Sequence, residues 1–193
     1  YPKQTKNLNV RYGISFISGE QAKNNLRREI RDYNLDDIAG KGRDIWNETL
    51  GKIQVKGDCE HSKTIFYTSL YRTYERMICL SEDGKYYSAF SGKIHEDNGR
   101  PFYTDDWIWD TYRATHPLRI LIEPEREADM VNSFITMAEQ MSEFWMPTFP
   151  EVTGDSRRMN SNHGVATVID AHVKGINNFD IKKAYLACKN GIT

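Results

Sequence analysis

Aromatic rings stand beside polar and charged side chains at several points of this 193-residue chain, which has four tryptophans and eleven tyrosines. The stretch 109–113 is one such point, since it carries Trp109, Asp110 and Arg113. A pyranose offers apolar C–H faces on which rings stack, and hydroxyls that polar groups bind. The mixture therefore suits a carbohydrate ligand, although aromatic side chains more often belong to a core.

Residue types alone leave other interpretations of these positions open. Asp110 stands where a helix begins near Trp109, and aspartate is a preferred N-cap, so capping is the favoured role from residue type. His163 suits a pocket and a helix N-terminus about equally. Trp107 and Trp109 are two positions apart and cannot share one helical face, so core packing is expected for one of them.

Other titratable residues predict structural roles. His116 precedes Pro117 with nothing at metal-ligand spacing beside it, which is typical of a structural histidine whose hydrogen bonds are satisfied. Three glutamates are expected to form a solvated first helical turn that complements the helix dipole, and not to be catalytic: Glu123, Glu125 and Glu127.

Composition excludes several classes of function. The net charge is −1, with 27% charged and 39% hydrophobic residues, so nucleic acid is not an expected partner. Cys59, Cys79 and Cys188 lack CxxC spacing and predict neither a zinc site nor a disulfide framework. No run is apolar enough to span a bilayer, and the first residues lack the apolar core of a signal peptide, as in a mature or excised chain.

The first third of the chain predicts one strand and two helices. The segment 9–17 alternates apolar residues as a strand does. One strand cannot fold alone, so its missing partners indicate a piece of a larger protein. A capping box at 18–21 opens a helix with Ala22, Leu26 and Ile30 on one stripe, and a second helix is expected over 36–50. Together these helices resemble a connector between two domains.

The remainder is predicted to be mostly helical. Helices are expected over 62–79, over 109–122 with a bend or division at Pro117, over 124–141, over 163–174, and from a cap at Asp180 to about Gly191. Turn sequences bracket a hairpin or irregular strand at 86–94. The stretch 144–162 is long for a connection inside a domain and is therefore expected to be a functional loop.

Three stretches, in order and at similar spacing, resemble glycoside hydrolase family 92: KTIFYTSLY at 63–71, WDTYRATHPL at 109–118 and HGVATVIDAHVKGI at 163–176. Between them, GKIH at 92–95 and WMP at 145–147 are also similar to that family. The opening VRYGISFIS at 10–18 resembles the strand that closes the family's β-sandwich domain. The likeness covers nearly the whole chain.

The resemblance implies a mainly α fold: a partial (α/α)6 toroid with a short β segment and a helical connector at the N-terminus. Residues 1–17 would be the last strand or strands of a preceding β-sandwich domain, 18–58 the connector, and 59–193 the first part of the catalytic domain. The rest of the parent polypeptide would then be the chain's main partner.

The resemblance also implies a calcium-dependent, inverting exo-α-mannosidase, of α-1,2 type, that acts on mannose-capped glycans. Inversion needs a general acid and a general base. Both, with most calcium ligands, would lie beyond residue 193, so no catalytic or metal-binding residue is assigned within the chain. Trp109, Asp110 and His163 would line the mannose pocket, and Arg113, one helical turn from Asp110, would hold its carboxylate in place.

Two other interpretations remain open. One is a non-catalytic carbohydrate-binding or scaffold fragment; the other is a different (α/α)6 glycosidase, because this architecture hosts many chemistries. A secreted or periplasmic location is implied by the resemblance only.

Overall fold

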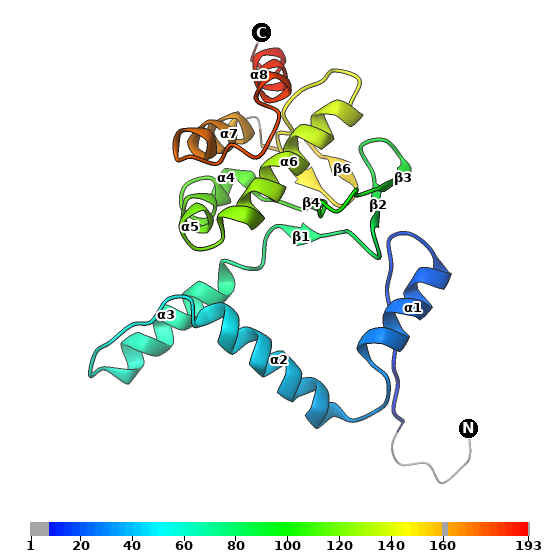
Figure 1. Cartoon of the computed structure of the whole chain (residues 1–193), viewed down its shortest axis with the longest axis vertical. Coiled ribbons are helices and arrows are strands. Elements are labelled where there is room, and N and C mark those ends of the chain that lie inside the picture. Colours follow the sequence, from blue (N-terminus) through cyan, green and yellow to red (C-terminus); the bar gives the residue numbers. More distant parts are fainter. Residues whose placement is uncertain (1–7, 160–161, 193) are drawn as a thin grey trace. The chain divides into compact units, whose positions relative to one another are not determined.

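The computed structural model describes residues 8–159 and 162–192, whose helices and strands are labelled in Figure 1. The chain divides into two compact units, within Tyr1–Tyr67 and Thr68–Thr193. The predicted boundaries at 17/18 and 58/59 are not tested by this division and stay predictions.

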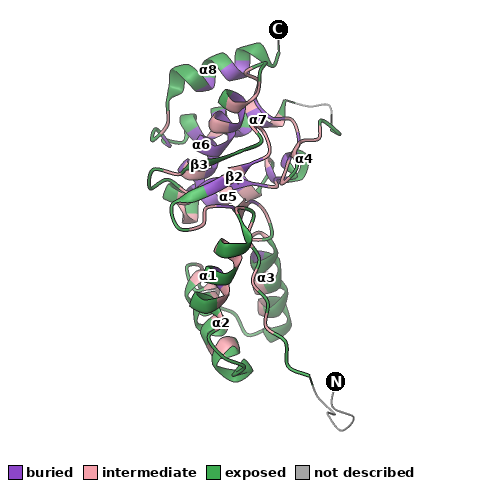
Figure 2. Ribbon diagram, turned by 90° about the vertical axis from the view of Figure 1, so that its right-hand side faces the viewer, coloured by how far each residue is buried: buried purple, intermediate pink, exposed green. Residues whose placement is uncertain are grey.

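Helices dominate the first unit. They are α1 (Gly19–Glu29), α2 (Leu35–Leu50) and the beginning of α3 (Glu60–Arg72). Ser18 caps α1 by accepting a hydrogen bond from the backbone N–H of Gln21, which confirms the predicted N-cap. In α1 only Asn25 is buried and in α2 no residue is, so this unit has little core of its own (Figure 2).

The predicted strand at 9–17 forms no ladder with other described residues. Its alternation is nevertheless present, because Val10, Tyr12, Ile14 and Phe16 are all exposed, at 69%, 75%, 71% and 43%. An apolar face that alternates with period two and is left exposed is what a strand shows when its partner is missing. Of the predicted domain segment 1–17, residues 1–7 lie outside the described residues.

The second unit combines helices with three short antiparallel ladders, β1–β4, β2–β3 and β5–β6. In chain order its elements are β1 (Ile78–Cys79), β2 (Lys85–Ser88), β3 (Lys93–Glu96), β4 (Tyr103–Thr104), α4 (Ile108–Thr111), α5 (Thr115–Ile122), α6 (Pro124–Gln140), β5 (Pro150–Glu151), β6 (Gly154–Asp155), α7 (His163–Val173) and α8 (Ile181–Asn190). The predicted hairpin at 86–94 is confirmed as β2–β3.

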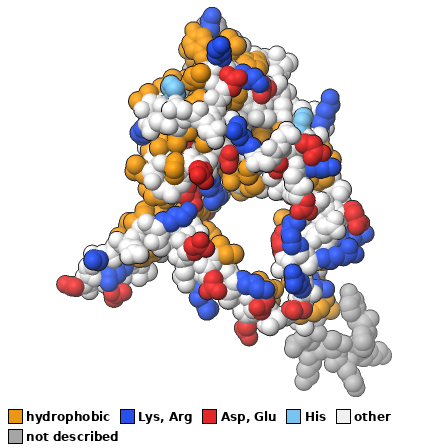
Figure 3. Space-filling model, viewed as in Figure 1, with side chains coloured by type: hydrophobic (Ala, Val, Ile, Leu, Met, Phe, Trp, Pro, Cys, Tyr) orange, Lys and Arg blue, Asp and Glu red, His pale blue; other side chains and the backbone are white. Residues whose placement is uncertain are grey.

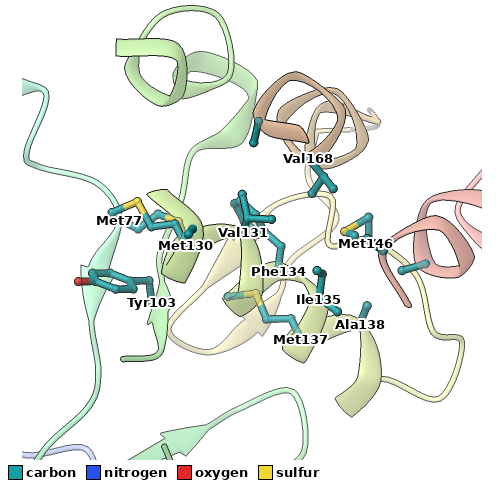
Figure 4. Close-up of a cluster of buried hydrophobic side chains, with 14 of the residues drawn as sticks. Met77, Tyr103, Met130, Val131, Phe134, Ile135, Met137, Ala138, Met146 and Val168 are labelled. Atoms are coloured by element: carbon teal, nitrogen blue, oxygen red, sulfur yellow. The ribbon is translucent and has the colours of Figure 1, made fainter. Parts of the chain in front are cut away.

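Helix α6 is the centre of this unit (Figures 1 and 4). Every residue from Met130 to Ile135 is buried, so the helix is covered on all sides. Val131, Phe134, Met137 and Ala138 have 0% of their surface exposed. Helices α5, α7 and α8 and strand β4 all contact α6, which gives the site described below a rigid support.

Two predicted helix boundaries are wrong. The helix expected over 62–79 ends at Arg72, because Ile78 and Cys79 pair instead with Thr104 and Tyr103. The helix expected over 109–122 is divided, but before Pro117 and not at it. Pro117 lies in the first turn of α5, where its missing N–H has no intrahelical acceptor to lose.

Candidate functional site

A short turn at 106–111 holds two of the predicted site residues at the surface. Asp106 and Ile108 are fully buried, whereas Trp107 and Trp109 are 45% and 41% exposed. Asp110 is exposed as well. Ile108 thus anchors the turn in the core while its neighbours point outward. The expectation that one of the two tryptophans packs in the core is wrong.

Asp110 does not cap α4. The N-cap position is Trp107, and no side chain caps that end. The backbone N–H of Asp110 donates to the carbonyl of Trp107 at 2.8 Å, and the residue itself is exposed, next to Trp109 in the chain. The helix-cap interpretation is therefore wrong, and the carboxylate is accessible to a ligand.

An aromatic cluster joins this turn to the beginning of α7. The ring of His163 lies 5.3 Å from that of Trp109 and stacks on that of Tyr112 at 4.1 Å, with an interplanar angle of 19°. The structure thereby brings Trp109 and His163 together from distant parts of the sequence. Tyr112 was not among the predicted site residues, although its position three residues after Trp109 on a helical turn could have indicated it.

Gly164 allows this close approach of α7. A Cβ atom at this position would lie 3.0 Å from the carbonyl oxygen of Pro147 and 3.5 Å from Cδ1 of Ile108. A side chain at position 164 would therefore require the carbonyl of Pro147 or the start of α7 to shift by a few tenths of an ångström. The glycine that follows His163 is therefore part of what places the imidazole beside Trp109.

Arg113 lies next to the cluster, with its guanidinium 5.6 Å from the centre of the Tyr112 ring. In the described residues, no ion pair joins Arg113 to Asp110. Arg113 and Tyr112 instead line an open hollow of about 590 Å³ whose other wall includes Asp170 of α7 and Lys174, the residue that follows this helix. The structure thus places a cationic group within the site, at the side of the aromatic cluster.

The loop before α7 is ordered by one carboxylate. Asp155 accepts hydrogen bonds from the backbone N–H groups of Thr148, Phe149 and Arg157 at 2.8–3.1 Å. The carbonyl of Pro150 accepts from the backbone N–H of Asp106 at 2.9 Å, which ties this loop to the turn 106–111. Residues 160 and 161 of the predicted functional loop lie outside the described residues.

Beneath the turn lies a buried chain of ionisable side chains. Nε2 of His116 is 2.9 Å from Oδ2 of Asp106, and Nδ1 is 2.9 Å from Oε1 of Glu127. Burial alone would lower the pKa of His116, but the charges of Asp106 and Glu127 and their hydrogen bonds outweigh it and raise the pKa to about 10. His116 is therefore an imidazolium that donates to both carboxylates at neutral pH.

The burial of Glu127 contradicts the prediction that the three glutamates form a solvated first turn. Its side chain is fully buried, because α6 turns this position inward toward His116. Glu123 is also largely buried and pairs with Arg119 at 2.7 Å, whereas Glu125 is exposed as predicted. The structural role predicted for His116 is consistent with this pairing, and the identity of its partners is the part that sequence reasoning missed.

A second hollow, of about 550 Å³, lies between β3 and α6. Three of its polar lining side chains already make hydrogen bonds: Arg100 donates to Asn132 at 2.8 Å, and Ser133 accepts from the backbone N–H of Tyr103 at 2.9 Å. Since these three side chains are engaged, the hollow is a weaker candidate for ligand binding than the turn 106–111.

The described residues contain no group of three or more histidine, cysteine, aspartate or glutamate side chains that could hold a metal ion. No helix in the same residues is long and apolar enough to cross a membrane.

The family model and the solved structures that match this chain agree with one another. A model of the glycosyl hydrolase family 92 catalytic domain matches residues 21–193. The structure of a family GH92 inverting mannosidase from Bacteroides thetaiotaomicron VPI-5482 matches with a TM-score of 0.80 and 35% identity, over 90% of this chain and 23% of that one. A family GH92 α-mannosidase from Bacteroides thetaiotaomicron matches with a TM-score of 0.84 and 30% identity, over 92% of this chain and 24% of that one.

The latter enzyme has also been solved in complex with mannoimidazole, and that structure matches with the same TM-score of 0.84. A search among curated proteins found no match. The chain covers 23–24% of the solved relatives, which have an (α/α)6 catalytic domain. The predicted fold class, mainly α and part of an (α/α)6 toroid, is confirmed.

Proposed function

This chain belongs to glycoside hydrolase family 92, and we propose that it forms part of an inverting exo-α-mannosidase in which Trp109, Asp110, Arg113 and His163 line the mannose pocket. The proposed substrates are mannose-capped glycans with terminal α-1,2-linked mannose. The observation that carries the proposal is the exposed pair of Trp109 and Asp110, held beside His163 in a chain that matches the catalytic domain of this family.

The chemistry of these side chains suits a terminal mannose. A carboxylate accepts hydrogen bonds from two neighbouring hydroxyls at once, and Asp110 is exposed to do so. The ring of Trp109 offers an apolar surface to the C–H face of the sugar, and Arg113 and His163 supply donors at its side. The described residues thus provide binding and orientation.

Hydrolysis needs further groups. An inverting glycosidase uses one carboxylic acid to protonate the leaving oxygen and one carboxylate to activate water. We place both in sequence outside this chain, because the chain covers less than a quarter of its solved relatives. Exposed apolar side chains gather over α7 and α8 (Figure 3), as expected if further helices of the toroid pack there: Ile169, Val173, Ile181, Tyr185 and Leu186.

Calcium dependence is part of the proposal, with ligands mostly outside this chain. Chelation with EDTA is expected to abolish mannose release by the complete protein, and added Ca²⁺ to restore it, because a hard cation bound to oxygen ligands is readily withdrawn by a chelator. The measurement is the initial rate of mannose release before chelation, after it, and after readdition of Ca²⁺. Mg²⁺ readdition is the control, and full activity in EDTA contradicts the dependence.

We likewise propose a secreted or periplasmic location, which the resemblance to glycoside hydrolase family 92 implies. Cell fractionation followed by immunodetection tests it: the protein is expected in the periplasm or medium, and confinement to the cytoplasm contradicts it.

The function is tested by assaying the complete protein against a panel of terminal α-mannosides of different linkages, with β-mannosides, α-glucosides and acidic polysaccharides as comparison. Mannose release from the α-1,2 linkage above the others is the expected result. Binding of mannosides without hydrolysis would favour a carbohydrate-binding scaffold. Turnover of another sugar would favour a different (α/α)6 glycosidase.

A further inference from the structure

The turn that carries Trp109 and Asp110 is closed by a side chain at each end. Oγ1 of Thr111, the last residue of α4, donates to Oδ1 of Asp106 at 2.8 Å. Both side chains are buried, Asp106 fully and Thr111 to 8% exposure. The two exposed site residues therefore lie on a short segment whose ends are joined by one hydrogen bond.

The same carboxylate is fixed from its other side. Oδ2 of Asp106 pairs with Nε2 of His116 on α5, and Nδ1 of His116 pairs with Oε1 of Glu127 on α6. With both carboxylate oxygens of Asp106 engaged, its side chain has no freedom to rotate. The turn is thereby attached through His116 to the central helix of the unit.

Glu127 makes His116 hard to replace. In the described residues, Oε2 of Glu127 is buried without a hydrogen-bond partner, so the imidazolium supplies the only hydrogen bond to this carboxylate that the structure shows. A neutral side chain at position 116 would leave two buried carboxylates without a countercharge. A purely structural link between α5 and α6 would need no buried charge, since apolar side chains of similar volume would serve.

We propose that Asp106, His116 and Glu127, together with the hydroxyl of Thr111, are positioning residues for the mannose pocket, because they fix the turn from which Trp109 and Asp110 meet the sugar. This inference rests on the proposed function. None of the four side chains needs to contact substrate. Their effect on hydrolysis is through the placement of Trp109 and Asp110, where a displacement of about 1 Å is enough to cost up to about 100-fold in rate.

Thr111 offers the cleanest test, since its variants keep all three charges. Thr111→Val removes the hydroxyl at nearly constant volume, and Thr111→Ser keeps it. In the complete protein we expect Thr111→Val to lower kcat/KM for a terminal α-mannoside about tenfold, mainly through a higher KM, and Thr111→Ser to stay within about twofold of wild type. Ser133→Ala, which removes other buried hydrogen bonds on α6, is the control for a loss of stability alone.

Hydrogen exchange over residues 107–112, followed by mass spectrometry, measures the local opening of the turn independently of activity. Exchange of this peptide is expected to accelerate in Thr111→Val and to stay at the wild-type rate in Thr111→Ser and Ser133→Ala. Unchanged exchange and unchanged kcat/KM in Thr111→Val overturn the inference. If the wild-type protein releases no mannose but exchange is still faster in Thr111→Val, the proposed function is contradicted. The conclusion that the Thr111 hydroxyl closes the turn would then still hold.

Discussion

Asp110→Asn in the complete protein should lower kcat/KM for terminal α-mannosides roughly 100- to 1,000-fold, which corresponds to a loss of about 3–4 kcal/mol. The physical reason is that a carboxylate accepts hydrogen bonds from two sugar hydroxyls, whereas the asparagine amide presents one acceptor and one donor group. Stability should change by no more than about 0.5 kcal/mol, because the side chain is exposed. Initial rates and a thermal melt measure the two effects.

Glu125→Gln is the matched control for this substitution. Glu125 is an exposed acid in the first turn of α6, so its replacement removes the same charge away from the aromatic cluster. Its kcat/KM is expected to stay within about twofold of wild type. Wild-type kcat/KM in Asp110→Asn would show that the carboxylate does not bind the substrate and would remove the strongest site residue from the proposal.

His116→Gln should destabilise the protein by about 3–5 kcal/mol, because it leaves the buried carboxylates of Asp106 and Glu127 without their countercharge. Urea denaturation of the complete protein at pH 7, monitored by tryptophan fluorescence, measures the loss. His61→Gln is the control, since His61 is exposed on α3, and it should change stability by less than about 0.5 kcal/mol. A His116→Gln variant as stable as wild type would contradict the assignment of His116 as a buried imidazolium.

The pH dependence of stability provides a further check on the same residue. The pKa of His116 is raised from 6.5 to about 10 in the folded chain, so the folded state holds a proton that the unfolded state releases between these values. The stabilisation by His116 is therefore complete below about pH 6.5 and is lost as the pH rises toward 10. This contribution, with a slope of up to about 1.4 kcal/mol per pH unit, should be absent in His116→Gln.

Local signals in the sequence predicted local structure well. The caps at Ser18 and Asp180 are confirmed, because a capping side chain needs only the backbone N–H groups two or three residues away. The hairpin β2–β3 followed from its turn residues in the same way. The predicted end of α3 was wrong, because Ile78 and Cys79 continue the helical pattern of the sequence. In the structure they pair with β4, which comes much later in the chain.

The site was predicted only in part for a related reason. Trp109, Asp110 and His163 were proposed as site residues through the family resemblance, and the structure brings the rings of Trp109 and His163 together. The partners of His116 were missed, since no spacing rule relates Asp106, His116 and Glu127. They meet only when α5 and α6 pack beside the turn that contains Asp106. Glu127 was expected in solvent because a charged residue in a first helical turn is usually exposed. Its position on α6 instead faces the interior.

The central claim is that this chain supplies the mannose-binding wall of an inverting α-mannosidase. The most direct measurement is a proton NMR time course of a terminal α-1,2-mannoside incubated with the complete protein and with its Asp110→Asn variant. Release of β-mannose first, followed by mutarotation, with a strongly reduced rate in the variant, is the expected result. Release of α-mannose first, or no hydrolysis of any α-mannoside by the wild-type protein, would contradict the account.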